Sequence, residues 1–264
     1  MRLFLVLLLC LPAWAQDLAF AKSGQGPGLV LIHGFAGNRG VWTDLAKDLA
    51  SRFTVLAVDL PGCGQSPAPP PGPVDFGAVA DAVAKVARRE LEAPFVVVAH
   101  SMGGLVGLRV AARHPELVRG LALLDAPLMP LEGVQAEKLA RAFEQDGAGT
   151  FRERYARFTS SPEQLERVVA EAGRIPGAVL AAYTRGRMVS NESSAARVKC
   201  PVLLLASPIL LPVGHNPDQE ARAAGYGPLG TLAVVRLGQA KHWVMWDEPA
   251  LTRKALTEFT GTLK

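Results

Sequence analysis

One serine lies where a buried strand is followed at once by a helix. The sequence VVVAHSMGGLVGLRVAARH, residues 96–114, places Ser101 after an apolar run and directly before a helical pattern. So tight a turn exposes its central residue at the edge of a sheet, next to a helix N-terminus. Small residues relieve the crowding, and Ala99 and Gly103 stand two positions before and after the serine. Ser101 is therefore the candidate nucleophile.

A serine at this position predicts acyl-transfer chemistry. Its hydroxyl is un-ionised at neutral pH, so a histidine must take its proton and a carboxylate must orient that histidine. The negative oxygen that forms during attack also needs hydrogen-bond donors fixed in advance. The rest of the chain must bring these groups to Ser101.

Apolar runs alternate with helical patterns over most of the chain. Strands are predicted in 28–34, 54–66 (ending in a glycine-rich loop), 95–100, 118–127, 200–207 and 231–238, and helices in 40–53, 75–91, 104–114, 217–225 and from 248 onward. The strands read as continuous apolar runs, which predicts an α/β fold with a mostly parallel central sheet and helices on both faces.

Residues 127–197 interrupt this alternation, because only helical patterns occur there. In SPEQLERVVAEAG, residues 161–173, Ser161 is placed to cap a helix, Gln164 to complete a capping box and Gly173 to end it. We expect 127–197 to form an inserted helical lid on a core made of 16–126 and 198–264. The lid would lie across the carboxyl ends of the strands, where ligands bind in such sheets.

Four motifs, in order, resemble the α/β-hydrolase superfamily: HGFAG after the first strand, then DLPGCGQS, AHSMGG, and GQAKHWVMWDEP near the end. The resemblance covers nearly all of the chain after its first 15 residues. It is closest to the esterase-like branch that has a lid and a signal peptide. It implies the α/β-hydrolase fold, a nucleophile elbow at Ser101 and a triad in the order serine, acid, histidine. In the elbow pattern G-x-S-x-G, this chain has Ala99 in the first glycine position.

The resemblance selects one of the five histidines. His242 follows the last predicted strand, where family members carry the catalytic histidine. His33 is expected to shape the oxyanion loop, and the side chain of His100 to point away from its neighbour Ser101. We expect His114 to cap a helix end and His215 to lie in a surface loop.

The acid departs from the commonest family pattern, which would put an aspartate where this chain has Leu210. Asp125 closes the preceding apolar strand, a costly place for a carboxylate unless it is paired. Some branches, haloalkane dehalogenases among them, hold their acid there, after the strand that the family counts as its sixth. We expect Asp125 to orient His242. Capping the start of the lid is its alternative role, and Asp218 and Glu220 are the alternative acids.

The resemblance also implies an oxyanion hole made of two backbone N–H groups, those of Phe35 and Met102. Because the main chain donates, the side chains matter little for this task; they are expected to line the pocket. His33, Gly34, His100 and Gly103 are expected to support the site from the HG turn and the elbow. Asp59, in VDLPG, is expected to fix a loop.

Composition excludes several other classes of protein. The formal net charge of +4 comes without a dense basic block, so no nucleic-acid partner is expected. No cysteine and histidine cluster has zinc-ligand spacing, and no metal or cofactor is expected. Cys63 and Cys200 are expected to be free thiols because the predicted strands hold them far apart.

The first 15 residues, MRLFLVLLLCLPAWA, combine an early arginine, a short apolar run and an A-x-A cleavage site. This pattern predicts a signal peptide over 1–15 and export to the periplasm or the medium. A first core strand and a membrane anchor are the alternatives. The run is too short for a stable span, which needs about 20 apolar residues.

The lid residues bear on the substrate. Apolar pocket walls could come from Leu128, Met129, Phe151, Tyr155, Phe158, Tyr183 and Met188, and arginines occur at 141, 152, 154, 157, 185 and 187. Solvated helix faces are the expected place for these arginines, and an acidic substrate is the alternative. The sequence predicts a serine carboxylesterase for small to medium esters. Thioesterase, lactonase, carbon–carbon hydrolase and haloperoxidase-like activities remain alternatives, as does an inactive binding protein of this fold, since Leu210 replaces the usual acid.

Overall fold

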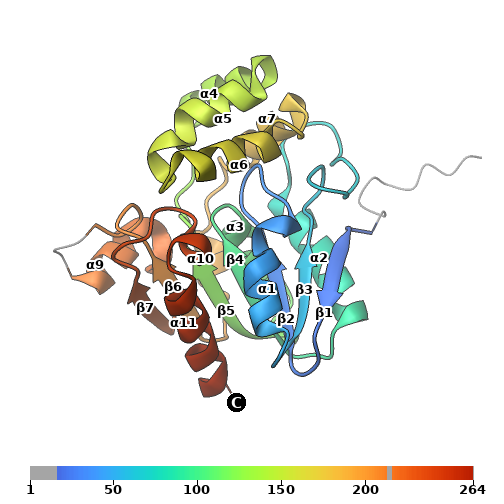
Figure 1. The fold of residues 1–264 in the computed structure, drawn as a ribbon, viewed down its shortest axis with the longest axis vertical. Helices are drawn as coiled ribbons and strands as arrows, with labels where there is room; N and C mark the ends of the chain where they lie inside the picture. The colour runs from blue at the N-terminus through green and yellow to red at the C-terminus, as the bar shows by residue number, and fades with distance from the viewer. Residues whose placement is uncertain (1–16, 213–215, 264) are drawn as a thin grey trace, which may run out of the picture.

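A central sheet organises the protein in the computed structural model, which describes residues 17–212 and 216–263 (Figure 1). Its strands are β1 (Phe20–Ser23), β2 (Gly28–Ile32), β3 (Thr54–Val58), β4 (Phe95–His100), β5 (Val118–Leu124), β6 (Val202–Ala206) and β7 (Leu232–Arg236). Their spatial order is β1-β3-β2-β4-β5-β6-β7, and all neighbours pair in parallel except β1 with β3. The predicted signal peptide lies outside the described residues, as does His215.

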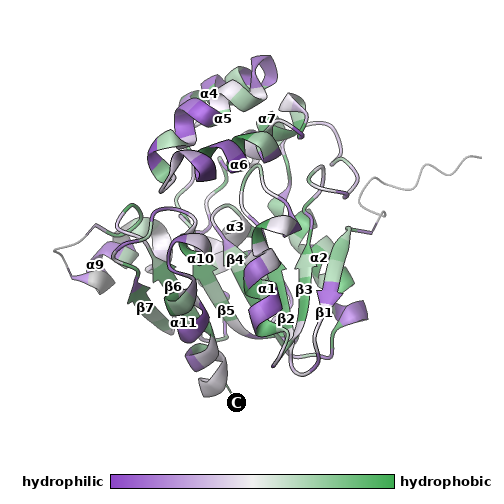
Figure 2. Ribbon diagram, in the orientation of Figure 1, coloured by the Kyte–Doolittle hydropathy of each residue, from purple (hydrophilic) through white to green (hydrophobic). Residues whose placement is uncertain are grey.

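Burial explains why the strands are apolar throughout. Every residue of β2, β4 and β6 is buried, and Figure 2 draws the inner strands of the sheet mainly in green, the colour of hydrophobic residues. Helices α1 (Thr43–Leu49) and α11 (Pro249–Thr262) cover one face, and α2 (Phe76–Glu90) and α3 (Gly103–Arg113) cover the other (Figure 1). The remaining core helices are η2 (Arg39–Trp42), α9 (Pro217–Ala221), η4 (Arg222–Tyr226) and α10 (Val244–Asp247).

The edge strand β1 was not predicted from the sequence. Its residues FAKS pair antiparallel with β3, from Phe20 opposite Val58 to Ser23 opposite Val55. Three of the four residues are exposed, so neither an apolar run nor an alternation marks the strand. Strand β1 forms because its backbone pairs with β3, and such pairing leaves no periodic pattern in the sequence.

Between β5 and β6 the chain is helical, as the sequence predicts. The elements are α4 (Gly133–Gln145), α5 (Gly147–Tyr155), η3 (Ala156–Phe158), α6 (Pro162–Ala172), α7 (Gly177–Gly186) and α8 (Glu192–Ala195). Figure 1 shows α4 to α7 above the carboxyl ends of the strands. The Ser161 hydroxyl accepts from the Gln164 N–H at 3.1 Å, as expected of a cap. The reciprocal bond is displaced by one residue, because the Gln164 side chain accepts from Ser160 N–H instead.

Three further features concern chemistry outside the sheet. Cys63 and Cys200 are free thiols. In the described ranges, no helix is long and apolar enough to cross a membrane. Over the same residues, no group of three or more histidine, cysteine, aspartate or glutamate side chains is placed to hold a metal ion.

Candidate active site

Three side chains from distant parts of the chain form one hydrogen-bonded series. Ser101 follows β4, Asp125 follows β5, and His242 lies in the loop after β7. The Ser101 hydroxyl lies 2.7 Å from His242 Nε2, and His242 Nδ1 lies 2.7 Å from Asp125 Oδ2. With its proton on Nδ1, the imidazole donates to Asp125 and accepts from Ser101. All three residues are buried.

The backbone is strained at the site. Three non-glycine residues in the described part of the chain have positive φ, namely Ala36 (57°), Ser101 (52°) and Asp125 (44°). Each stands just after a strand end or an expected oxyanion donor. Such conformations cost on the order of 1–3 kcal/mol each and persist where the surrounding fold imposes them. Here they aim two side chains and one loop at the same point.

Glycines, which have no Cβ, leave room for the elbow. A Cβ at Gly103 would lie 2.4 Å from the His33 carbonyl oxygen, and one at Gly34 would lie 2.9 Å from Ser101 Cβ. Ala99, which replaces the first glycine of the pattern, faces Gly107 of α3, where a Cβ would come within 2.9 Å of the alanine methyl. The methyl that the elbow gains is therefore accommodated by a glycine on the facing helix.

Asp125 is held in place through its second oxygen. Oδ1 accepts from the Ser207 N–H at 2.9 Å, which leaves Oδ2 for His242. The alternative acid Glu220 lies 2.5 Å from the Arg236 guanidinium, and nothing is described of the Asp218 side chain. Near Asp125, the buried Tyr226 hydroxyl donates to the Ala126 carbonyl, a support that the sequence did not reveal. Burial and the Asp125 charge raise the pKa of Tyr226 well above its usual value.

The two expected oxyanion donors are free of protein acceptors. Among the described residues, neither the Phe35 nor the Met102 backbone N–H donates a hydrogen bond. Met102 precedes α3, so its N–H belongs to a helix N-terminus, which favours negative charge. A tetrahedral oxygen beside Ser101 could accept from both groups.

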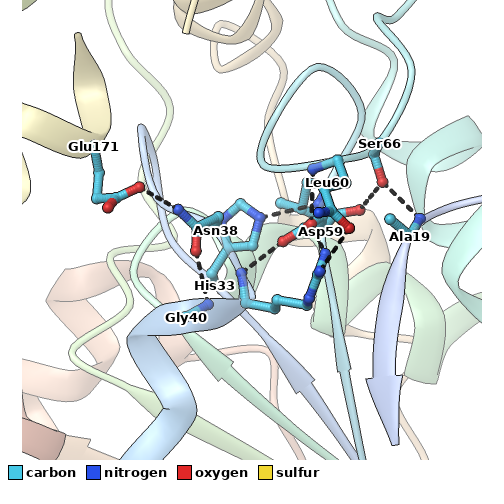
Figure 3. A network of polar contacts seen from close by, with 10 residues as sticks. Ala19, His33, Asn38, Gly40, Asp59, Leu60, Ser66 and Glu171 are labelled. Carbon is cyan, nitrogen blue, oxygen red and sulfur yellow. Dashed lines mark hydrogen bonds and ion pairs between the residues drawn. The ribbon is translucent and has the colours of Figure 1, made fainter. Parts of the chain in front are cut away.

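The loop that carries Phe35 is braced by the polar network of Figure 3. His33 accepts from the Leu60 N–H at Nε2, 2.9 Å away, and its Nδ1 donates to the Gly34 carbonyl at 2.8 Å. Asn38 accepts from the Gly40 N–H at 2.7 Å and donates to Glu171 of α6. The loop is thus tied both to the strand end at Leu60 and to the helical segment above it.

Asp59 fixes the adjoining loop, as the sequence predicts. Its carboxylate accepts from the Arg39 N–H at 2.7 Å and the Gln65 N–H at 2.9 Å, and it forms an ion pair with the Arg39 guanidinium. The Asp59 carbonyl accepts from the Ser66 hydroxyl, which in turn accepts from the Ala19 N–H (Figure 3). These bonds give Asp59 a structural task away from Ser101.

His33 and His100 are neutral supports. His100 Nε2 donates to the His242 carbonyl at 2.8 Å, which holds the loop of the proposed base. Burial lowers the pKa of both imidazoles, that of His100 well below its usual value with a further contribution from His242. His114 caps α3 and contacts Asp81, 2.8 Å away.

A cavity of about 240 Å³ opens beside the series and is continuous with solvent. Core residues line one side: Ser101, Asp125, Ile209, Leu210 and His242. The segment 127–197 supplies the other: Pro127, Arg154, Tyr155, Phe158 and Arg187. Phe35 lines a neighbouring cavity with Phe151 and Trp243.

The helical segment is bonded to the histidine loop. The His242 N–H donates to the Phe158 carbonyl at 3.1 Å. Asp247 accepts from the Ser160 hydroxyl at 2.6 Å and from the Lys241 N–H at 2.8 Å. The position of His242 therefore depends on the segment as well as on the core.

Comparison with known proteins identifies the family. A model of the alpha/beta hydrolase fold matches residues 27–249. The chain belongs to this family. The predicted family and fold are confirmed.

Individual relatives of this α/β hydrolase carry hydrolase names. A pimeloyl-[acyl-carrier protein] methyl ester esterase of Chromobacterium violaceum is 34% identical over 208 residues, which cover 72% of this chain and 80% of the relative. A 2-(acetamidomethylene)succinate hydrolase of Mesorhizobium japonicum is 28% identical over 256 residues, which cover 90% and 89%. The solved structure of a thermophilic esterase from Thermogutta terrifontis matches with a TM-score of 0.80 and 24% identity over 92% of this chain and 93% of its own, a likeness of fold. These names agree with the prediction of an ester-hydrolysing enzyme.

Proposed function

We propose that this α/β hydrolase is a serine carboxylic ester hydrolase that acts on small to medium esters. The observation that carries the proposal is the unbroken series from Asp125 through His242 to Ser101, with 2.7 Å at both steps. The unpaired N–H groups of Phe35 and Met102 support it, as do the relatives named as esterases. An inactive binding protein would not need so strained and so completely bonded a site.

Acylation follows from this geometry. The Ser101 oxygen attacks the ester carbonyl carbon while its proton moves to His242 Nε2. Asp125 stabilises the imidazolium through Nδ1–H. The carbonyl oxygen becomes negative and accepts from the Phe35 and Met102 N–H groups, and one such donor contributes roughly 3–4 kcal/mol to lowering the barrier. His242 then donates its proton to the departing alcohol, and the acyl group stays on Ser101.

Deacylation uses the same groups with water. His242 takes a proton from a water molecule, whose oxygen attacks the acyl-enzyme carbonyl. The second tetrahedral oxygen again lies against the two N–H groups. The carbon–Ser101 bond breaks, the proton returns to the serine oxygen, and the carboxylic acid leaves through the cavity.

Covalent labelling tests the proposal. We would expose the purified protein to a fluorophosphonate and measure intact mass, with Ser101→Ala as the control. The expected result is one adduct on the wild type and none on the variant, together with turnover of a series of p-nitrophenyl esters. A folded wild type that neither reacts nor hydrolyses any ester would leave an inactive protein of this fold as the better description.

We further propose that the protein is exported. The support lies in residues 1–15, with their arginine, apolar run and A-x-A site. Expression in a bacterial host followed by fractionation and N-terminal sequencing tests this. The expected mature chain begins at Gln16, and a chain that keeps its first residues in the cytoplasm would overturn the proposal.

A further inference from the structure

Several arginines of the helical segment form ion pairs with glutamates. Arg141 and Arg185 pair with Glu137, at 3.0 and 2.8 Å. Similar exposed pairs are Arg152 with Glu166 and Arg174 with Glu171. The arginines in these pairs agree with the expectation of solvated helix faces.

Arg154 and Arg187 are the two cations of this segment that border the cavity beside Ser101, and they are not among these pairs. In residues 17–212 and 216–263, neither guanidinium has an ion pair or a hydrogen bond to a protein group. Both line the cavity that contains Ser101 and His242. Arg154 is exposed, whereas Arg187 is partly buried and its Nε is shielded from solvent without a partner. The sequence did not separate these two cations from the others.

The two guanidiniums influence each other and Tyr155. Burial lowers the pKa of Arg187, and the charge of Arg154 lowers it further. Burial raises the pKa of Tyr155, and the two arginines oppose this effect. The Tyr155 hydroxyl itself makes no hydrogen bond with any described protein group. Two cations and one uncommitted hydroxyl therefore border one cavity.

This arrangement is unfavourable in the empty protein. A partly buried cation loses hydration, and a like charge nearby adds repulsion. Natural proteins normally place a carboxylate against such a group. A ligand carboxylate would offset both effects, because a guanidinium binds its two oxygens with parallel hydrogen bonds. Tyrosine could donate to the same group.

We propose that Arg187 and Arg154, with Tyr155, form an anion-binding subsite that selects esters carrying a free carboxylate. This inference rests on the proposed ester hydrolysis at Ser101 and names its substrate class. The carboxylate could belong to the acyl part, as in a monoester of a dicarboxylic acid, or to the alcohol part. The cavity joins subsite and nucleophile, so one small molecule can reach both.

Matched substrates test the charge preference. Monomethyl adipate carries the carboxylate on the acyl side, 4-acetoxybutyrate carries it on the alcohol side, and dimethyl adipate is neutral. We expect Arg187→Gln to lower kcat/KM about ten- to a hundredfold for at least one anionic ester, the loss of a charged hydrogen bond, and less than about threefold for dimethyl adipate. Arg154→Gln should act in the same direction, more weakly because it is exposed. The control Arg152→Gln, on the same helix as Arg154, should leave all three rates unchanged.

Binding tests the subsite without turnover. Calorimetry with glutarate on Ser101→Ala should detect binding that Arg187→Gln abolishes. An equal loss of kcat/KM for neutral and anionic esters in Arg187→Gln would overturn the subsite, even where fluorophosphonate labels Ser101. The absence of glutarate binding to Ser101→Ala would overturn it as well. Glutarate binding that depends on Arg187, without labelling or ester turnover in the wild type, would support the subsite and overturn the proposed hydrolysis. The two claims thus fail separately.

Discussion

Replacing Asp125 with asparagine isolates the charge of the acid from its shape. In Asp125→Asn the oxygen that accepts from the Ser207 N–H can stay, so the backbone around residue 125 should keep its position. The amide nitrogen would then face His242 Nδ1, where Oδ2 now lies at 2.7 Å. An amide N–H donates to Nδ1 and so favours the tautomer with its proton on Nε2. That tautomer cannot take the proton of Ser101.

The expected loss follows from this distance. With charge centres about 4 Å apart and an effective dielectric constant near 20, the carboxylate stabilises the imidazolium of the transition state by about 4 kcal/mol. This corresponds to about a thousandfold in rate. The unfavourable tautomer adds to it, and the same change in a serine protease lowers kcat about ten thousandfold. We expect a fall in kcat/KM between these two values.

The assay is hydrolysis of p-nitrophenyl acetate at several pH values, together with the rate of fluorophosphonate labelling. Glu220→Gln is the matched control, because Glu220 was the alternative acid and its carboxylate lies against Arg236. We expect it to change kcat/KM less than about threefold, since His242 Nδ1 donates to Asp125 rather than to Glu220. Thermal unfolding of both variants checks that the fold survives.

Two results would refute this reasoning. Asp125→Asn that keeps more than about a tenth of the wild-type rate would mean that the charge does not act on His242 in the transition state. A larger loss in Glu220→Gln than in Asp125→Asn would mean that the acid comes from the loop after β6.

Three other predictions concern stability. Ala36→Gly should keep the wild-type activity. Ala36→Val should lower the free energy of unfolding by about 2 kcal/mol, because a β-branched residue fits poorly at positive φ. Equal melting temperatures for the two variants would contradict this prediction. Because the folded pKa values of His33 and His100 lie below their usual value, unfolding takes up protons below about pH 6.5. The free energy of unfolding should therefore fall as the pH is lowered below about 6.5, by up to about 1.4 kcal/mol per pH unit for each imidazole. Urea melts at pH 7.5 and 5.5 measure this fall, which should be smaller in His100→Gln than in the wild type. Arg39→Ala removes the partner of the buried Asp59 and should cost about 3 kcal/mol in a urea melt, while an unchanged midpoint would show that the pair contributes nothing.

Much of the site could be predicted because its residues violate ordinary sequence patterns. Ser101 interrupts the transition from strand to helix, and Asp125 places a carboxylate at the end of a buried apolar strand, where it needs a partner. The absence of an acid at Leu210 then directed attention to Asp125. The donors Phe35 and Met102 came from the family resemblance, since any residue can supply a backbone N–H.

Other features depend on three-dimensional packing that no local pattern reports. Helical periodicity could not distinguish Arg154, which borders the cavity, from Arg152, which pairs with Glu166 on another helix, α6, 14 residues along the chain. Tyr226 gave no signal because its partner, the Ala126 carbonyl, is 100 residues distant. Gly107, which leaves room for the Ala99 methyl, lies on the facing helix α3, so its role is apparent only from the folded structure.

With Asp125 as the proposed acid, the loop directly after β6, residues 207–212, supplies no side chain to the proposed reaction. In that loop the Ser207 backbone N–H donates to Asp125, a bond that any residue except proline could make. Ile209 and Leu210 of the same loop line the cavity. In a relative whose acid stands at the Leu210 position, every change there risks the reaction itself. Here natural selection, or a mutant library at positions 209 and 210, can change the shape of the cavity while Ser101, Asp125 and His242 keep their places after β4, β5 and β7. The proposed triad thus leaves this enzyme a region in which specificity can evolve separately from catalysis.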